Sequence, residues 1–158
     1  MIVPDVDLLL YASDSGSPFH DRARSWWGNC LSGREAVGLT YPVIFAFLCL
    51  STSARVYTDP MTLAESADCI RSWLARRICQ VLQSPADHVA RVVELLGAAG
   101  GAGGNLVTDA QIAALASSYR AVVHTADRDF LRVPQVRCHF PLDDERRRRA
   151  AASSRRGR

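Results

Sequence analysis

The sequence predicts an α/β protein in which helices cover both faces of a parallel sheet. Short apolar segments alternate along the chain with longer segments of helical spacing, which is typical of parallel sheets. The 158 residues are about the size of one domain, and 48% of them are hydrophobic, so a packed core is expected. Strands are expected at residues 2–4, 36–39, 78–82, 121–124 and, at an edge of the sheet, 136–140.

Helices are expected where capping residues precede apolar positions of helical spacing. Ser17 and Ser84 each precede a proline and are predicted N-caps, and the segments that begin at Thr62 and Thr108 have the capping-box pattern. A glycine-rich loop at residues 97–105 lacks the Lys-Ser/Thr pair of a phosphate-binding P-loop. The expected helices span residues 8–12, 19–31, 41–51, 62–75 and 84–97, with a last one from residue 108.

The charge of the chain is unevenly distributed. Residues 1–142 hold 12 Arg and 13 acidic residues, whereas residues 143–158 hold 7 Arg and 3 acidic residues. We therefore expect a domain at residues 1–142 and a disordered Arg-rich tail at residues 143–158. Such a tail either adds salt-dependent affinity for nucleic acid or is a solvated end without a role. The sequence shows neither an apolar stretch long enough to span a membrane nor the positively charged start of a signal peptide, so a cytoplasmic protein is expected.

Acidic residues follow two of the predicted strands and open one helix. Asp5 and Asp7 follow the first strand, Asp127 and Asp129 follow the fourth, and Asp109 lies in the first turn of a helix. Because the carboxyl ends of parallel strands form the binding edge of α/β proteins, these acids are expected in one cleft. Clustered oxygen ligands favour Mg²⁺ or Mn²⁺, which can activate water for phosphodiester hydrolysis. A purely structural role, as caps of helices and turns, is the alternative.

Three motifs resemble those of PIN-domain ribonucleases of the VapC toxin type. Residues 5–12, Asp-Val-Asp-Leu-Leu-Leu-Tyr-Ala, are similar to the family's opening motif, which commonly reads Asp-Val-Asn. Residues 105–110, Asn-Leu-Val-Thr-Asp-Ala, resemble its central acidic motif. Residues 125–130, Thr-Ala-Asp-Arg-Asp-Phe, resemble its closing motif. The three occur in the family's order, and the resemblance covers residues 1–142.

The resemblance implies a PIN-like, Rossmann-like parallel sheet of about five strands between helices. It also implies a Mg²⁺-dependent endoribonuclease whose toxicity a VapB-type antitoxin holds in check, and a homodimer is common in the family. By the same resemblance, Asp5 and Asp109 are metal-binding catalytic residues, and Asp127 is the next member of the catalytic cluster. The remaining candidates are neighbours of these acids: indirect metal contacts are expected of Asp7 and Asp129, and RNA contacts of Arg128 and Arg132.

Two residues depart from the family pattern. Asp7 stands where Asn is usual, which adds negative charge near the expected metal. Many members carry a Glu on the third helix, but residues 41–53 contain no acid, and Ala46 occupies about the place of that Glu. The site is therefore expected to bind metal more weakly, or to use the substrate phosphate as a ligand, unless Asp7 supplies the missing charge.

Two other functions are compatible with parts of the sequence. A PIN fold that has lost its chemistry could serve as a module that binds RNA or a partner, as the acid-free third helix suggests. The Asp-Val-Asp of residues 5–7 is also similar to the nucleophile motif of haloacid-dehalogenase-like phosphatases. Those enzymes generally place a Lys against the phosphate, and this chain contains no lysine. The ribonuclease is therefore the preferred interpretation.

Overall fold

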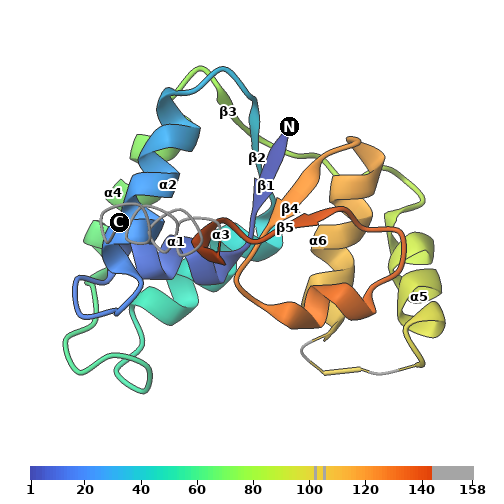
Figure 1. Cartoon of the computed structure of the whole chain (residues 1–158). Helices are drawn as coiled ribbons and strands as arrows, with labels where there is room; N and C mark the ends of the chain where they lie inside the picture. Colours follow the sequence, from blue (N-terminus) through green and yellow to red (C-terminus); the bar gives the residue numbers. More distant parts are fainter. Residues whose placement is uncertain (102, 105, 144–158) are drawn as a thin grey trace, which may run out of the picture.

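The computed structural model describes residues 1–101, 103–104 and 106–143 (Figure 1). The strands are β1 Ile2–Pro4, β2 Val37–Leu39, β3 Cys79–Val81, β4 Val122–His124 and β5 Cys138–His139. The helices are α1 Val6–Ser13, α2 His20–Ser32, α3 Tyr41–Ser51, α4 Leu63–Leu74, α5 His88–Ala98 and α6 Leu106–Ser118, followed by the 3-10 helix η1 Arg128–Arg132.

All five strands form one sheet in the order β3-β2-β1-β4-β5, and every neighbouring pair is parallel. The predicted parallel sheet of about five strands is therefore confirmed, with β5 at an edge. The chain builds the sheet outward from β1 to β3 and then returns to place β4 on the other side of β1. Reversal of strand order creates a crevice at the carboxyl ends of β1 and β4, the usual ligand site of open α/β sheets.

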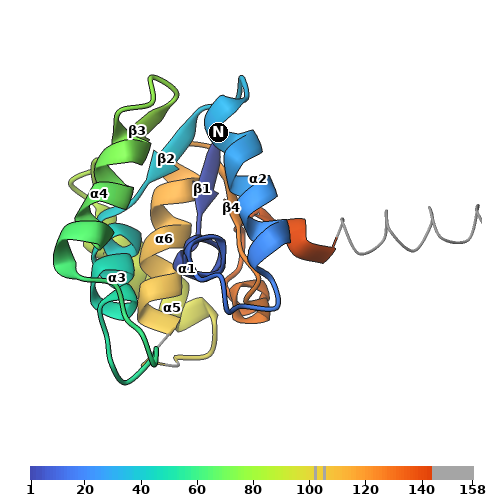
Figure 2. The same ribbon diagram turned by 90° about the vertical axis from the view of Figure 1, so that its left-hand side faces the viewer.

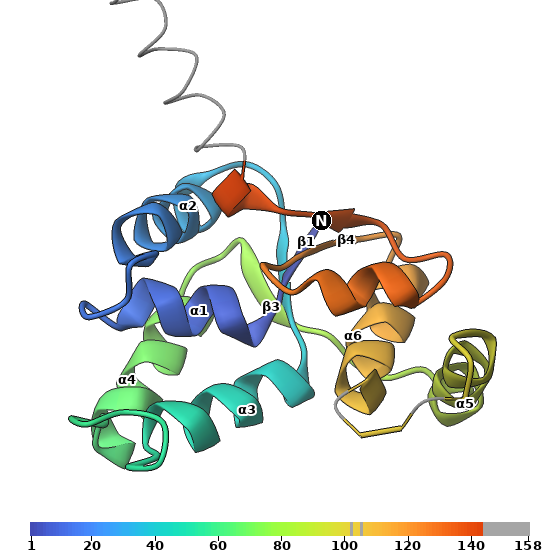
Figure 3. The same ribbon diagram turned by 60° about the horizontal axis from the view of Figure 1, so that its bottom comes forward.

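Helices cover both faces of the sheet. Figure 1 shows α2 and α4 on one face and α6 on the other, with α5 outside α6. In Figure 2, α4 lies next to β3 and α2 next to β1. Trp27 of α2 and Phe47 of α3 both contact Trp73 of α4, at ring-centroid distances of 5.5 and 4.8 Å, and these rings fill that side of the core. Figure 3 brings the carboxyl ends of the strands forward, with α1 and α3 in front of them.

Four predicted helix starts are wrong. The first helix, α1, begins at Val6 rather than at Leu8, with Asp5 as its N-cap. Ser17 and Pro85 belong to turns, in which their carbonyls accept from the N–H groups of His20 and His88, at 3.0 Å in both cases. The helices begin only after these turns, α2 at His20 and α5 at His88. The capping box predicted at Thr108 is not used, because α6 already begins at Leu106. The capping box at Thr62 is confirmed by reciprocal contacts with Glu65.

The predicted Arg-rich tail lies outside the described residues, apart from Asp143. That residue accepts a hydrogen bond from Arg128, so the described domain reaches at least to its position. Within the described part of the chain, every helix is too short or too polar to cross a membrane.

Gly38, in the middle of β2, has no room for a side chain. A Cβ at this position would lie 2.7 to 2.8 Å from three carbon atoms of the buried Leu82 side chain. We predict that Gly38→Ala lowers the free energy of unfolding by about 1–3 kcal/mol, because Leu82 must leave its packed position. Urea denaturation measures this change.

Gly97 provides the matched control, since a Cβ there would meet no atom within 4 Å. Gly97 lies in α5, so Gly97→Ala should leave stability unchanged or raise it by up to about 1 kcal/mol through helix propensity. Equal midpoints for the two variants would contradict the packing argument.

Candidate active site

Asp5 is a buried carboxylate at the junction of β1 and α1. Only 5% of the Asp5 surface is exposed to solvent. The Asp5 backbone N–H donates a hydrogen bond to the His124 carbonyl at 2.8 Å. Asp5 is also the N-cap of α1, where its Oδ1 accepts from the Val6 N–H at 2.7 Å. Strand pairing and helix capping together hold this carboxylate at the carboxyl end of the central strand.

Thr125 connects the two strand ends. Its fully buried hydroxyl donates to Asp5 Oδ2 at 2.8 Å and accepts from the Asp127 N–H at 2.9 Å. Thr125 belongs to the closing motif of residues 125–130, but its role is not among those that the resemblance implies. The sequence signal for the Thr125–Asp127 contact is their spacing of two residues, because a Thr hydroxyl in a turn often accepts from the N–H two residues later.

Asp7 joins α1 to the segment after β4. Its Oδ2 accepts from the Ala126 N–H at 2.8 Å, and its Oδ1 accepts from the Leu8 N–H at 2.6 Å. An Asn at this position could accept the Ala126 hydrogen bond through its amide oxygen. The Asn that is usual in the family's opening motif would therefore preserve this contact while removing the charge.

The other predicted acids lie on two further elements. Asp127 caps η1 by accepting from the Asp129 N–H at 2.8 Å, so the cap of this turn is Asp127 rather than Asp129. Asp129 is exposed and lies 3.7 Å from Arg132. Asp109 is half-buried in the first turn of α6, where the helix dipole favours a negative charge.

The carboxylates influence one another electrostatically. Burial raises the pKa of Asp109 to about 7, and the charges of Asp5, Asp127 and Asp129 add to that rise. Burial likewise raises the pKa of Asp7 to about 7, with further contributions from Asp5 and Asp127. Burial also raises the pKa of Asp5, although the Thr125 hydroxyl opposes the change. The predicted acids are thus near enough to repel one another, as expected of one cleft.

These residues fit a hard cation that is only partly enclosed by protein. Among residues 1–101, 103–104 and 106–143, no three Asp, Glu, His or Cys side chains converge tightly enough to hold a metal ion by themselves. The donors are carboxylate oxygens whose mutual repulsion a divalent cation would relieve. Mg²⁺ commonly uses one or two carboxylates and keeps several waters or substrate oxygens, so a closed protein cage is not required.

The third helix lacks an acidic residue, as the sequence indicated. α3 contains no carboxylate, and Ala46 is half-buried in its middle. The charge of the site therefore comes from the ends of β1 and β4 and from the first turn of α6.

Arg128 and Arg132 lie near the closing motif, as predicted, but both are already paired. The Arg128 guanidinium contacts Asp143 and lies 4.1 Å from the centre of the Phe140 ring. Arg132 is within 3.7 Å of Asp129. An RNA phosphate would have to compete with these acids, which makes both residues weaker candidates for RNA contacts than their positions suggested.

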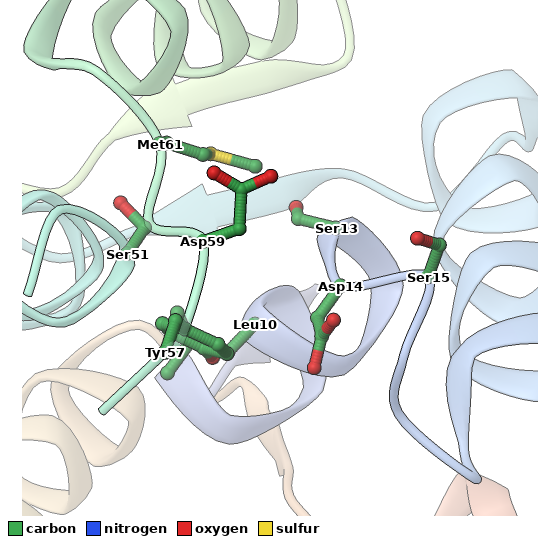
Figure 4. A pocket seen from close by; sticks show the side chains of 8 residues that line it. All are labelled: Leu10, Ser13, Asp14, Ser15, Ser51, Tyr57, Asp59 and Met61. Carbon is green, nitrogen blue, oxygen red and sulfur yellow. The ribbon is translucent and has the colours of Figure 1, made fainter. Parts of the chain in front are cut away.

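A small hollow of about 130 Å³ at the other end of α1 also contains acids. Figure 4 shows Ser13 and Asp14, at the end of α1, facing Asp59 and Met61 from the segment after α3. Asp5 and Asp14 cap opposite ends of this eight-residue helix, about 12 Å apart. The hollow is therefore separate from the acidic cluster at the strand ends.

Comparison with known protein families identifies the family of this chain. The profile of the PIN domain matches residues 2–136, which includes all five predicted acids. The chain belongs to the PIN-domain family. Its five-stranded parallel sheet is therefore that of a PIN domain.

Individual relatives of this PIN domain are VapC proteins. Ribonuclease VapC33 of Mycobacterium tuberculosis is 39% identical over 142 residues, which cover 90% of this chain and 99% of the relative. Ribonuclease VapC37 of the same organism is 34% identical over 145 residues, covering 89% of this chain and 97% of the relative. The identity extends over nearly the whole length of both relatives, so the chain is a VapC-type PIN domain.

Solved structures show the same fold. VapBC2 from Rickettsia felis, bound to a DNA fragment from its promoter, matches with a TM-score of 0.63 at 18% identity, covering 88% of this chain and 98% of that chain. VapC20 of Mycobacterium tuberculosis, a toxin that cleaves the sarcin-ricin loop, matches with a TM-score of 0.63 at 20% identity. The match covers 83% of this chain and 93% of that chain. At such identities the likeness concerns the PIN fold alone.

The raised pKa of Asp7 makes the stability of the metal-free protein depend on pH. A carboxyl whose pKa rises from 3.8 to about 7 on folding stabilises the fold while it is protonated, and this stabilisation is lost as pH rises through 7. We predict that, in EDTA, wild type loses about 1 kcal/mol relative to Asp7→Asn between pH 6 and pH 8.

Thermal or urea unfolding of both proteins at the two pH values measures this difference. The variant corrects for other groups that titrate in this range, above all Asp109, whose pKa burial also raises to about 7. It likewise corrects for His124, whose pKa burial lowers to about 4 and which destabilises the fold at the acidic end instead. A constant stability difference between the two proteins across this range would show that Asp7 does not titrate there.

Proposed function

We propose that the protein is a Mg²⁺-dependent endoribonuclease and the toxin of a toxin–antitoxin pair. The observation that carries the proposal is the set of carboxylates at the carboxyl ends of β1 and β4, in a chain that is 39% identical to a VapC ribonuclease. Asp5, Asp109 and Asp127 are the catalytic residues of this proposal. Burial, together with the charges of neighbouring acids, raises the pKa values of Asp5 and Asp109, which fits a site that works with a cation.

Asp5 and Asp109 would hold the metal, which we propose to be Mg²⁺, with Mn²⁺ as a substitute. When bound, such an ion lowers the pKa of a water molecule and offsets negative charge on the phosphodiester. Thr125 positions Asp5 through the 2.8 Å hydrogen bond to its Oδ2, and it orients the Asp127 backbone in the same turn. Asp7 and Asp129 act indirectly, through the loop contacts and charges described above.

The proposed partners are an RNA substrate and a VapB-type antitoxin. Two structural neighbours, from Rickettsia felis and Salmonella typhimurium, are VapBC complexes bound to DNA, and both share the fold of this chain. A homodimer is part of the proposal as well, because VapC-type PIN domains commonly pair. The Arg-rich residues 143–158 would add sequence-independent attraction to RNA.

A PIN-fold module without catalysis remains the second candidate, because α3 supplies no carboxylate to the site. The phosphatase alternative is disfavoured by the family match and by the contacts of Asp7. Both oxygens of Asp7 accept from backbone N–H groups within α1 and the loop after β4, so its side chain is not directed as a general acid.

We predict that wild type degrades single-stranded RNA in millimolar Mg²⁺ and that EDTA stops the reaction. Asp5→Asn and Asp109→Asn should each lower the rate at least about 100-fold, since loss of even an indirect contact to a catalytic metal often costs 10- to 100-fold. Gel analysis of a labelled RNA measures the rates.

Asp68→Asn, an exposed substitution on α4, is the matched control and should retain wild-type activity. Degradation by wild type that is no faster than by Asp5→Asn would sink the nuclease proposal and favour the non-catalytic module. Rapid turnover of a small phosphomonoester would favour the phosphatase.

Asp7→Asn tests whether the extra acid compensates for the acid-free third helix. The variant keeps an acceptor for the Ala126 N–H, so the fold should be retained. We predict that the Mg²⁺ concentration for half-maximal activity rises about fivefold, because one nearby negative charge contributes on the order of 1 kcal/mol to cation binding. An unchanged Mg²⁺ requirement would exclude compensation by Asp7.

A further inference from the structure

A hollow of about 390 Å³ opens directly beside the acidic cluster. Thr125 and Ala126 form part of its wall, and these are the residues that donate hydrogen bonds to Asp5 and Asp7. The hollow is therefore separated from the carboxylates by a single hydrogen-bonded layer. Its volume is within the range of about 300–1,000 Å³ that is typical of small-molecule sites.

Three aromatic residues also line this hollow. Tyr11, Phe19 and Phe140 are all half-buried, so part of each ring surface remains accessible. The Tyr11 and Phe19 rings are 5.0 Å apart at 45°, and the Phe140 ring is backed by the Arg128 guanidinium. Tyr11 also lies in the field of the acids, since burial and then the charges of Asp7, Asp127 and Asp5 raise its pKa.

Arg22 adds a positive charge at the same place. Its guanidinium lies 5.1 Å from the centre of the Phe19 ring and donates one hydrogen bond, at 3.0 Å, to the Leu142 carbonyl. Within the part of the chain that the structure describes, none of the ion pairs involves Arg22, in contrast to Arg128 and Arg132. A guanidinium has five N–H donors, so Arg22 can bind a phosphate while keeping the Leu142 contact.

We propose that this hollow binds one unstacked nucleotide of the RNA substrate, next to the bond that is cleaved. The base packs against the rings of Tyr11, Phe19 and Phe140, and Arg22 contacts a phosphate of the same strand. Single-stranded RNA is recognised in this way, by bases splayed out onto aromatic side chains and by arginine. The inference rests on the proposed ribonuclease function and names a binding site for its substrate.

Single-stranded RNA fits the hollow better than a segment of a protein partner. Its dimensions suit one nucleotide, and it combines stacking surfaces with Arg22, whose guanidinium has no carboxylate partner among the described residues. Asp143 also lines the hollow, but its carboxylate is already paired with Arg128. The hollow adjoins the acids through Thr125 and Ala126. If Arg22→Gln and Phe140→Leu cleave RNA normally but are no longer inhibited by the antitoxin, the hollow is an antitoxin site and the proposal is wrong.

The first test compares variants with matched controls. Arg22→Gln and Phe140→Leu should each lower kcat/KM for a short single-stranded RNA about tenfold, the usual effect of losing one stacked base or one phosphate contact. Arg24→Gln, on the exposed face of the same helix, and Phe45→Leu, an exposed ring on α3, should match wild type. Wild-type kcat/KM in both hollow variants, with their melting temperatures preserved, would overturn the proposal.

The second test locates the nucleotide. After the cleaved bond is mapped with wild type, a series of RNAs carries one abasic nucleotide at each position around it. One position next to the bond should show a penalty of about tenfold with wild type, and Phe140→Leu should abolish most of that penalty, as expected of two groups in contact. A penalty that Phe140→Leu leaves unchanged at every position would contradict stacking in the hollow.

A binding measurement in EDTA separates this inference from the proposed catalysis. Fluorescence anisotropy of a labelled single-stranded RNA should show about tenfold weaker binding to Arg22→Gln than to wild type or Arg24→Gln. If wild type binds RNA through Arg22 but never cleaves it, the catalytic proposal fails and the nucleotide site stands. If RNA is cleaved but neither binding nor cleavage depends on Arg22 and Phe140, the nucleotide site fails alone.

Discussion

Burial of the Asp5 carboxylate at the end of the central strand is the constraint on which the site depends. A carboxylate removed from water needs hydrogen-bond donors or a cation, because its charge is otherwise poorly tolerated in the interior. The protein supplies two donors, the Val6 N–H and the Thr125 hydroxyl, and leaves the remaining imbalance as a raised pKa. The geometry of the loop after β4 follows from satisfying this one group.

The same constraint connects the fold with the proposed chemistry. Thr125 can reach Asp5 only because β1 and β4 are neighbours, and they are neighbours because the chain reverses direction across the sheet after β3. Asp7 reinforces the junction through Ala126, and α6 adds Asp109 from the opposite face. The acids of the proposed metal site are thus held by the contacts that join β1 and α1 to the segment after β4. The stability of the fold and the electrostatics of the site are therefore linked.

Much of this fold could be predicted from the sequence, because strand and helix positions depend on local patterns. The five strands were found within a residue or two, and α3 was found to the residue. The starts of α2 and α5 were missed because the carbonyls of Ser17 and Pro85 accept hydrogen bonds in turns before each helix begins. The order of the strands, in contrast, depends on contacts between distant segments that no local pattern records.

The same difference between local and distant contacts applies to the site. Asp5, Asp109 and Asp127 could be predicted as candidate site residues because each follows a strand or opens a helix, where α/β proteins gather ligands. Thr125 also follows a strand, but its contact with Asp5, like that of Arg22 with Leu142, joins residues 120 positions apart and leaves no trace in a local pattern. Likewise, the acids that pair with Arg128 and Arg132 became apparent only in the folded chain.

The pairing of β1 with β4 also has a consequence for how the protein is made. Asp5 is synthesised some 120 positions before Thr125 and Asp127. An N-terminal fragment therefore contains the central strand without the partners that position its carboxylate. Contacts of such long sequence separation form late and slowly. The nascent chain therefore cannot assemble its acidic cluster until the segment that carries Thr125 and Asp127 has been synthesised.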